Sequence, residues 1–130
     1  MIKQFRYQDI IWLDLESPAA DEVKELGQKY GIHPLVLEEL THRSERPRVD
    51  VYNDFIYLIL HFPQEIDFII GKHFIITTHY ETVNSLNDFA KILETDLSLK
   101  RGHDKLHAGF IFYYIIKEIY ATLETRLNSL

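Results

Sequence analysis

The chain has 130 residues, a formal net charge of −6 and no cysteine. A chain of this length forms one domain with a substantial core, and its acidic balance argues against a nucleic-acid partner, because phosphate binding depends on clustered lysine and arginine. The lack of cysteine excludes disulfides and thiolate metal sites.

No segment of the sequence has the pattern of a membrane helix or a secretion signal. The longest apolar run covers the seven residues 110–116, whereas a membrane helix needs about 20. Residues 1–12 lack the apolar stretch of a signal peptide. We therefore expect a soluble chain.

The N-terminal part predicts one strand followed by one helix. Residues 10–15 are apolar and β-favouring, and they end at a turn signal. Ser17 followed by Pro18 predicts a helix N-cap and first helical position, and Gly31 predicts the end of that helix. Apolar residues recur at helical spacing in between, at Val23, Leu26 and Tyr30.

A second, short helix is predicted to begin at Pro34 and to carry two adjacent acids, Glu38 and Glu39. Its leucines are available for the core, namely Leu35, Leu37 and Leu40. Pro47 makes helix beyond residue 45 unfavourable, because the residue before a proline prefers an extended conformation. The chain between this helix and the next strand is basic, with Arg43, Arg46 and Arg48.

Two hairpins are predicted after that basic segment. Residues 49–52 and 55–62 flank an Asn53-Asp54 turn, and residues 66–70 and 74–78 flank Gly71-Lys72. The run 56–62 is almost continuously apolar, which is typical of a central strand that is covered on both faces.

The C-terminal part predicts two helices, at 83–97 and from about Asp104 to the end, separated by Gly102. The first half of the last helix is apolar all round, and we expect it to be buried. Its second half has the four-and-three spacing of a heptad seam, at Ile116, Tyr120, Leu123, Leu127 and Leu130. An amphipathic helix that lies back on the sheet explains this spacing equally well. The predicted fold class is α/β.

The sequence lacks the usual catalytic motifs, such as a nucleophile elbow, a phosphate-binding glycine loop or a His-Glu-x-x-His pair. We therefore expect no enzyme. The histidines at strand ends are expected to be satisfied edge or core residues, namely His61, His73 and His79.

Two spacings on helices are compatible with a metal site. His103 and His107 are four residues apart, as are Glu38 and His42. The adjacent carboxylates of Glu38 and Glu39 suit Mg²⁺ or Ca²⁺, which prefer oxygen ligands. The alternative for this acid pair is a solvated helix face that is paired with the neighbouring arginines.

The chain resembles the cytoplasmic N-terminal domain of the CorA family of divalent-cation transporters over essentially its whole length. The specific part is the run GIHPLVLE at 31–38, with its acidic pair, followed by RPRV at 46–49. Supporting strings are WLD at 12–14 with Pro18, YNDFIYLIL at 52–60 and DFIIGK at 67–72.

The resemblance implies an αβα sandwich, a mixed β-sheet flanked by helices on both faces, ending in the start of a long stalk-side helix. Residues 1–130 then form one cytoplasmic N-terminal domain, with an α/β core at 1–100 and a C-terminal helix at 101–130. That helix leads toward a stalk and a membrane part that are absent from this chain. In the family, five subunits surround one ion path, so the resemblance implies a homo-oligomer, a pentamer, that is linked to the membrane on its cytoplasmic side.

The resemblance also implies that Glu38 and Glu39 bind a regulatory Mg²⁺ between neighbouring subunits. The favoured hypothesis is therefore a regulatory, ion-sensing domain of a CorA-like transporter of Mg²⁺, Co²⁺, Ni²⁺ or Zn²⁺. The alternatives are a free-standing soluble metal-binding protein that uses His103 and His107, and a purely structural assembly domain.

Overall fold

The structure is a computed structural model that describes residues 2–44, 46–95 and 108–128. The six strands are β1 (Ile2–Tyr7), β2 (Ile10–Glu16), β3 (Arg48–Val51), β4 (Phe55–His61), β5 (Glu65–Gly71) and β6 (Phe74–His79). The helices are α1 (Ala20–Tyr30), α2 (Pro34–Glu39), α3 (Asn84–Thr95) and α4 (Ala108–Asn128).

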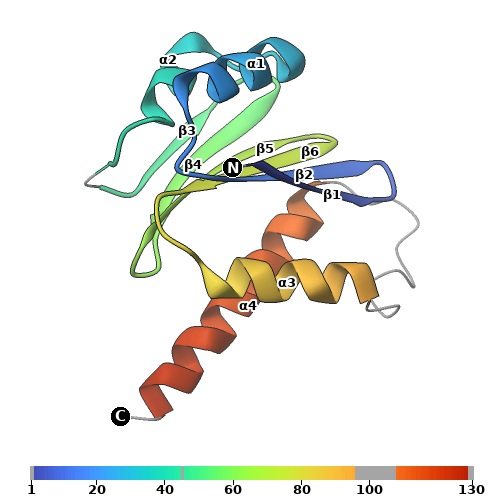
Figure 1. Ribbon diagram of the computed structural model, residues 1–130, viewed down its shortest axis with the longest axis vertical. Coiled ribbons are helices and arrows are strands. Elements are labelled where there is room, and N and C mark those ends of the chain that lie inside the picture. The colour runs from blue at the N-terminus through green and yellow to red at the C-terminus, as the bar shows by residue number, and fades with distance from the viewer. Residues whose placement is uncertain (1, 45, 96–107, 129–130) are drawn as a thin grey trace.

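The strands form one mixed sheet in the order β1-β2-β6-β5-β4-β3. Strands β2 and β6 run parallel, and each of the other neighbouring pairs is antiparallel. Helices α1 and α2 lie over one face of the sheet, and α3 and α4 lie over the other (Figure 1). The predicted αβα sandwich is confirmed.

Each face of the sheet carries its own buried cluster, because successive side chains of a strand point to opposite faces. On β2, Trp12 belongs to the cluster under α3 and α4, whereas Leu13 and Leu15 belong to the cluster under α1 and α2. The sheet therefore contributes side chains to two separate cores, one on each face.

Strand β1 was not predicted. It pairs antiparallel with β2 in the register Ile2↔Leu15, and it forms one edge of the sheet. Its polar residues, Lys3, Gln4 and Arg6, are exposed, as is typical of a protected edge strand. Because of these polar residues, the segment lacks the apolar pattern from which a strand is predicted.

The predicted start of α1 was wrong. The N-cap is Ala19, whose N–H donates to Glu22 Oε1 at 3.0 Å. Ser17 instead has a positive φ of 45°, and its hydroxyl donates to the Tyr80 carbonyl at 3.1 Å. The predicted helix end is confirmed at Gly31, whose φ of 66° lies in the left-handed region that glycine adopts without strain.

Helix α2 begins at Pro34 as predicted, and the N-cap is His33, whose Nδ1 accepts the Leu35 N–H at 3.1 Å. Leu40 is buried in the core under α1 and α2, but Leu35 is 62% exposed. Val36 takes the expected place of Leu35, at 1% exposure. The prediction for Leu35 was wrong because the helix is short and turns Val36 toward the sheet.

Both predicted hairpins are confirmed, with strand ends that differ by no more than one residue. The prediction that residues 56–62 form an inner strand covered on both faces is confirmed in its main features. Strand β4 pairs with β5 and β3, and its side chains enter both cores, Tyr57 on the side of α1 and α2 and Leu58 on the side of α3 and α4. Its position is next to the edge strand β3, and Ile56 is 39% exposed.

Helix α3 is confirmed, although Leu97 and the predicted start of the last helix near Asp104 lie outside the described residues. The first half of α4 is buried along one face only, at Ala108, Ile111 and Ile115, whereas Tyr113 is 58% exposed. A helix that lies on one side of a sheet has one buried face, so a run that is apolar all round does not imply full burial.

The predicted heptad residues of α4 that the structure describes divide between the core and the surface, and Leu130 lies outside the described residues. Ile116 and Leu123 pack against the core under α3 and α4, whereas Tyr120 and Leu127 are exposed. Within the described residues, none of the helices combines the length and apolar character that crossing a bilayer requires.

Candidate functional site

The predicted acid pair lies at the end of α2. Glu38 is exposed, and among the described residues its carboxylate forms no hydrogen bond or ion pair. Glu39 is half-buried and forms an ion pair with Arg48, the first residue of β3. Adjacent residues on a helix point about 100° apart, which accounts for their different surroundings.

Arg48 joins the acid pair to the sheet. Its Nε donates to Asp50 Oδ2 at 2.9 Å, and its guanidinium lies 5.7 Å from the ring centroid of Tyr57. The expectation that neighbouring arginines pair with the acids is thus met by Arg48. Arg43 instead lies 3.6 Å from a Glu81 oxygen.

The donor set fits a hard cation but is incomplete on this chain. Carboxylate oxygens suit Mg²⁺, which keeps several of its waters. The described part of the chain contains no group of three or more His, Asp or Glu residues placed around one metal position. His42 is exposed, and His103 and His107 lie outside the described residues. A cation at Glu38 and Glu39 therefore needs further ligands from water or from another chain.

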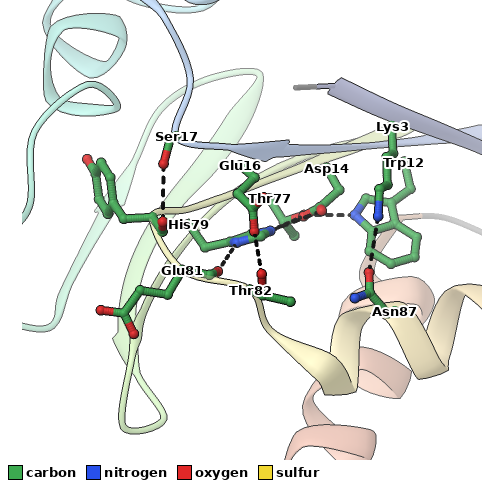
Figure 2. Close-up of polar contacts among 11 residues, drawn as sticks. Lys3, Trp12, Asp14, Glu16, Ser17, Thr77, His79, Glu81, Thr82 and Asn87 are labelled. Atoms are coloured by element: carbon green, nitrogen blue, oxygen red, sulfur yellow. Dashed lines mark hydrogen bonds and ion pairs between the residues drawn. The ribbon is translucent and has the colours of Figure 1, made fainter.

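A second polar centre, which the sequence did not reveal, is buried where β2 and β6 run parallel (Figure 2). Trp12 Nε1 donates to Thr77 Oγ1 at 2.9 Å, and the Thr77 hydroxyl donates to Asp14 Oδ1 at 2.6 Å. His79 Nε2 lies 2.9 and 3.0 Å from the two Asp14 oxygens. Asp14 is 5% exposed and His79 is 4% exposed.

The surroundings of His79 favour its charged form. Its Nδ1 lies 2.6 Å from the Glu81 carbonyl oxygen, so both ring nitrogens face oxygen acceptors. Only an imidazolium donates from both nitrogens. Burial acts to lower the pKa of His79, but the hydrogen bond and charge of Asp14 outweigh burial and raise that pKa above its ordinary value.

The buried centre forms one wall of a cavity of about 170 Å³ between the sheet and α3. Across this cavity, Lys3 Nζ donates to Asn87 Oδ1 at 3.4 Å, and Thr82 Oγ1 donates to Glu16 Oε1 at 3.1 Å. These contacts are all made within the chain. They connect β1, β2 and β6 to α3 and to the loop before it, and we interpret the arrangement as structural.

Sequence reasoning treated His79 as a satisfied edge or core histidine, which the geometry confirms. It did not identify the partner, because Asp14 lies 65 positions earlier in the chain. The signal available was one aspartate within the apolar strand 10–15, at a position that faces the core.

Comparisons with known proteins agree with this architecture. The family model described as "CorA-like Mg2+ transporter protein" matches residues 7–130. The cobalt/magnesium transport protein CorA of Methanocaldococcus jannaschii is 28% identical over 122 residues, which cover 85% of this chain and 37% of that protein.

Two solved structures have the same fold. The complete structure of the CorA magnesium transporter from Methanocaldococcus jannaschii matches with a TM-score of 0.71 and 24% identity, over 96% of this chain and 42% of that chain. The ZntB cytoplasmic domain from Vibrio parahaemolyticus matches with a TM-score of 0.69 and 15% identity, over 95% of this chain and 52% of that chain.

The chain spans about half or less of the length of each of these relatives. The family match, in contrast, extends from residue 7 to the last residue. The chain therefore belongs to the family of CorA-like Mg²⁺ transporter proteins.

Proposed function

We propose that this chain is the regulatory, ion-sensing domain of a CorA-like divalent-cation transporter, that it lies on the cytoplasmic side of the membrane, and that Mg²⁺ is the ion it senses. The observation that carries the proposal is the exposed carboxylate of Glu38 beside Glu39, at the end of a helix that packs on the sheet. The family description and a relative named as a cobalt/magnesium transport protein support Mg²⁺ as the ion.

The proposed mechanism is a shift between two arrangements of a homo-oligomer. One chain offers Mg²⁺ one or two carboxylates, so that the remaining ligands come from water and from a neighbouring copy. A cation that binds the closed arrangement more tightly than the open one shifts the population toward the closed arrangement. The net charge of −6 adds to this effect, because cations reduce the repulsion between acidic copies.

Arg48 competes with the cation in this scheme. Glu39 already pairs with its guanidinium, so a metal ion that binds Glu39 must displace it. Affinity for Mg²⁺ is therefore weaker than two free carboxylates would give, and Arg48→Gln is expected to tighten Mg²⁺ binding several-fold.

The test measures Mg²⁺ affinity, melting temperature and oligomeric state in the full-length protein and in this chain. The double variant Glu38→Gln, Glu39→Gln is expected to lose the Mg²⁺-dependent rise in melting temperature, because a ligand stabilises only the state it binds. Glu25→Gln, an exposed acid on α1, is the control and keeps the rise. If Mg²⁺ changes neither melting temperature nor oligomeric state of the full-length protein, the sensing function is wrong.

A structural assembly role is the second candidate. Tyr113, Tyr120 and Leu127 on α4 are 58%, 54% and 67% exposed, which leaves an apolar stripe on that helix available to other surfaces. Assembly that proceeds equally well with Mg²⁺ or with a chelator would favour this role over ion sensing.

A further inference from the structure

Two neighbouring acids on β5 lie beneath the segment that follows α2, with Asp67 buried and Glu65 half-buried. Glu65 and Asp67 are two residues apart on one strand, so their side chains leave the same face of the sheet. This is the face covered by α1 and α2, since Ile69, the next residue in the same row, belongs to that core. Asp67 is 1% exposed.

One oxygen of each acid has a partner. The Tyr57 hydroxyl donates to Asp67 Oδ2 at 2.8 Å, and the Ser44 N–H donates to Glu65 Oε1 at 2.6 Å. The other two oxygens, Glu65 Oε2 and Asp67 Oδ1, are buried and have no hydrogen-bond partner among the described residues. A buried polar atom without a partner is costly, so both oxygens require an explanation.

The charges around the pair are unfavourable for two carboxylates. The groups that face Asp67 from other elements are Tyr57 of β4, Tyr80 beyond β6 and Glu39 of α2. The described part of the chain places no lysine or arginine in an ion pair with Glu65 or Asp67. Arg43 and Arg48 lie over the rings of Tyr80 and Tyr57 instead.

We infer that Glu65 and Asp67 hold one proton between them at neutral pH, as a hydrogen-bonded carboxyl–carboxylate pair. With a single shared proton, one of the two unpartnered oxygens, Glu65 Oε2 or Asp67 Oδ1, carries the proton and donates it to the other. The proton also removes one of two adjacent negative charges. Burial, followed by the hydrogen bond to Glu65, raises the pKa of Asp67 far above its ordinary value, although the Tyr57 hydroxyl opposes that shift.

The shared proton has a structural consequence for the segment after α2, residues 40–44, here named the elbow. Glu65 holds the elbow through the Ser44 N–H, and His61 Nε2 lies 3.0 Å from the Ser44 carbonyl oxygen. The Tyr80 hydroxyl donates to the Leu40 carbonyl at 3.2 Å. Hydrogen bonds therefore hold the elbow to the sheet at both ends. One of the groups that form them, Glu65, belongs to the proton-sharing pair.

Loss of the proton loosens this attachment. Two ionised carboxylates repel each other, and a cavity of about 280 Å³ that is lined by Glu65, Ser44 and His61 provides room for Glu65 to turn away from Asp67. Glu65 then releases the Ser44 N–H. Proton binding and elbow attachment are thus coupled without a metal ion at Glu38 and Glu39.

The experiment follows the Asp67 side-chain carbon and the Ser44 amide by NMR in the unaltered chain, from pH 4 to pH 10, without divalent cations. Asp67 is expected to show the carbon shift of a protonated acid at pH 7 and to ionise only at alkaline pH. Exchange of the Ser44 amide hydrogen is expected to accelerate over the same pH range, by more than the intrinsic rise at exposed amides. The Glu65 side-chain carbon is followed in the same samples, and ionisation of both acids near their ordinary pKa values of about 4 would overturn the proposal.

Variants separate the proton from other occupants of the site. Asp67→Asn places an amide donor where the shared proton lies, so the Ser44 amide should stay protected up to pH 10, and unfolding should lose the release of about one proton. Asp88→Asn, an exposed acid on α3, should leave both readouts unchanged. If millimolar K⁺ or Mg²⁺ ionises Asp67 at pH 7, the pair is a cation site and the proton assignment is wrong.

Discussion

At the scale of single residues, His79 is a buried group whose surroundings favour its charged form. It is buried, both ring nitrogens face oxygen atoms, and Asp14 supplies the opposite charge. A buried ion pair adds little net stability when it is intact, but the removal of one partner leaves an uncompensated charge. This asymmetry makes His79 sensitive to substitution and to pH.

We predict that stability falls as pH rises through the folded-state pKa of His79. That pKa is raised above the unfolded value of about 6.5, so between the two values the native state binds more protons than the unfolded state. The contribution of the pair is therefore complete below about pH 6.5 and is lost at higher pH. Urea unfolding across this pH range measures the change.

His79→Gln should remove that pH dependence and should lower the free energy of unfolding by about 3 kcal/mol, because Asp14 is left without its charge partner. His73→Gln is the control, since His73 is exposed at the turn between β5 and β6. An unchanged pH profile in His79→Gln would show that His79 is not the titrating group.

At the scale of elements, helix α2 shows which part of an element can be predicted and which cannot. Pro34 marks the start of α2, because proline suits the first turn, whereas Pro18 precedes the start of α1 at Ala20. Which leucine faces the core depends on the angle at which a six-residue helix meets the sheet, and this angle is a tertiary property. Ser17 is a similar case, because its hydroxyl bonds to the distant Tyr80 carbonyl rather than to a local helix end.

Two leucines of this region give a matched test. Leu40→Ala is expected to lower the free energy of unfolding by about 2–5 kcal/mol, because it opens a cavity at a side chain that is 1% exposed. Leu35→Ala is expected to change it by less than about 0.5 kcal/mol, since that side chain is 62% exposed. Urea denaturation measures both values, and equal losses would contradict the observed orientation of α2.

At the scale of the whole molecule, two cores share one sheet, and we predict that they unfold together. Trp12, the single tryptophan, lies in the core under α3 and α4, so its fluorescence reports that side. Far-ultraviolet circular dichroism reports all elements. The two signals should have the same urea midpoint, because small domains usually unfold in one cooperative step. Separate midpoints would mean that one helix layer leaves the sheet before the other.

Most of the helices and strands could be predicted from local features of the sequence, namely the hairpin turns, Gly31 and the helical spacing of apolar residues in α3. The candidate metal site was proposed from the adjacent acids Glu38 and Glu39 and from the family resemblance. Pairing of the acids with an arginine was anticipated from the basic residues that follow α2. The proton-sharing pair and the His79 centre were not predicted, because strand alternation places an acid on a face without revealing which partner lies across from it. Membership in a transporter family agrees with the expectation that the chain is not an enzyme.

The parallel pairing of β2 with β6 also affects how the chain folds. The other neighbouring strands are joined by short turns, whereas Asp14 and Thr77, which meet across the parallel pair, are 63 residues apart. The chain entropy lost on closing a loop grows with the logarithm of its length, so this contact is the most costly in the sheet. The bonds from Asp14 to Thr77 and His79 form only when that long loop closes, and they stabilise the contact that is entropically hardest to make.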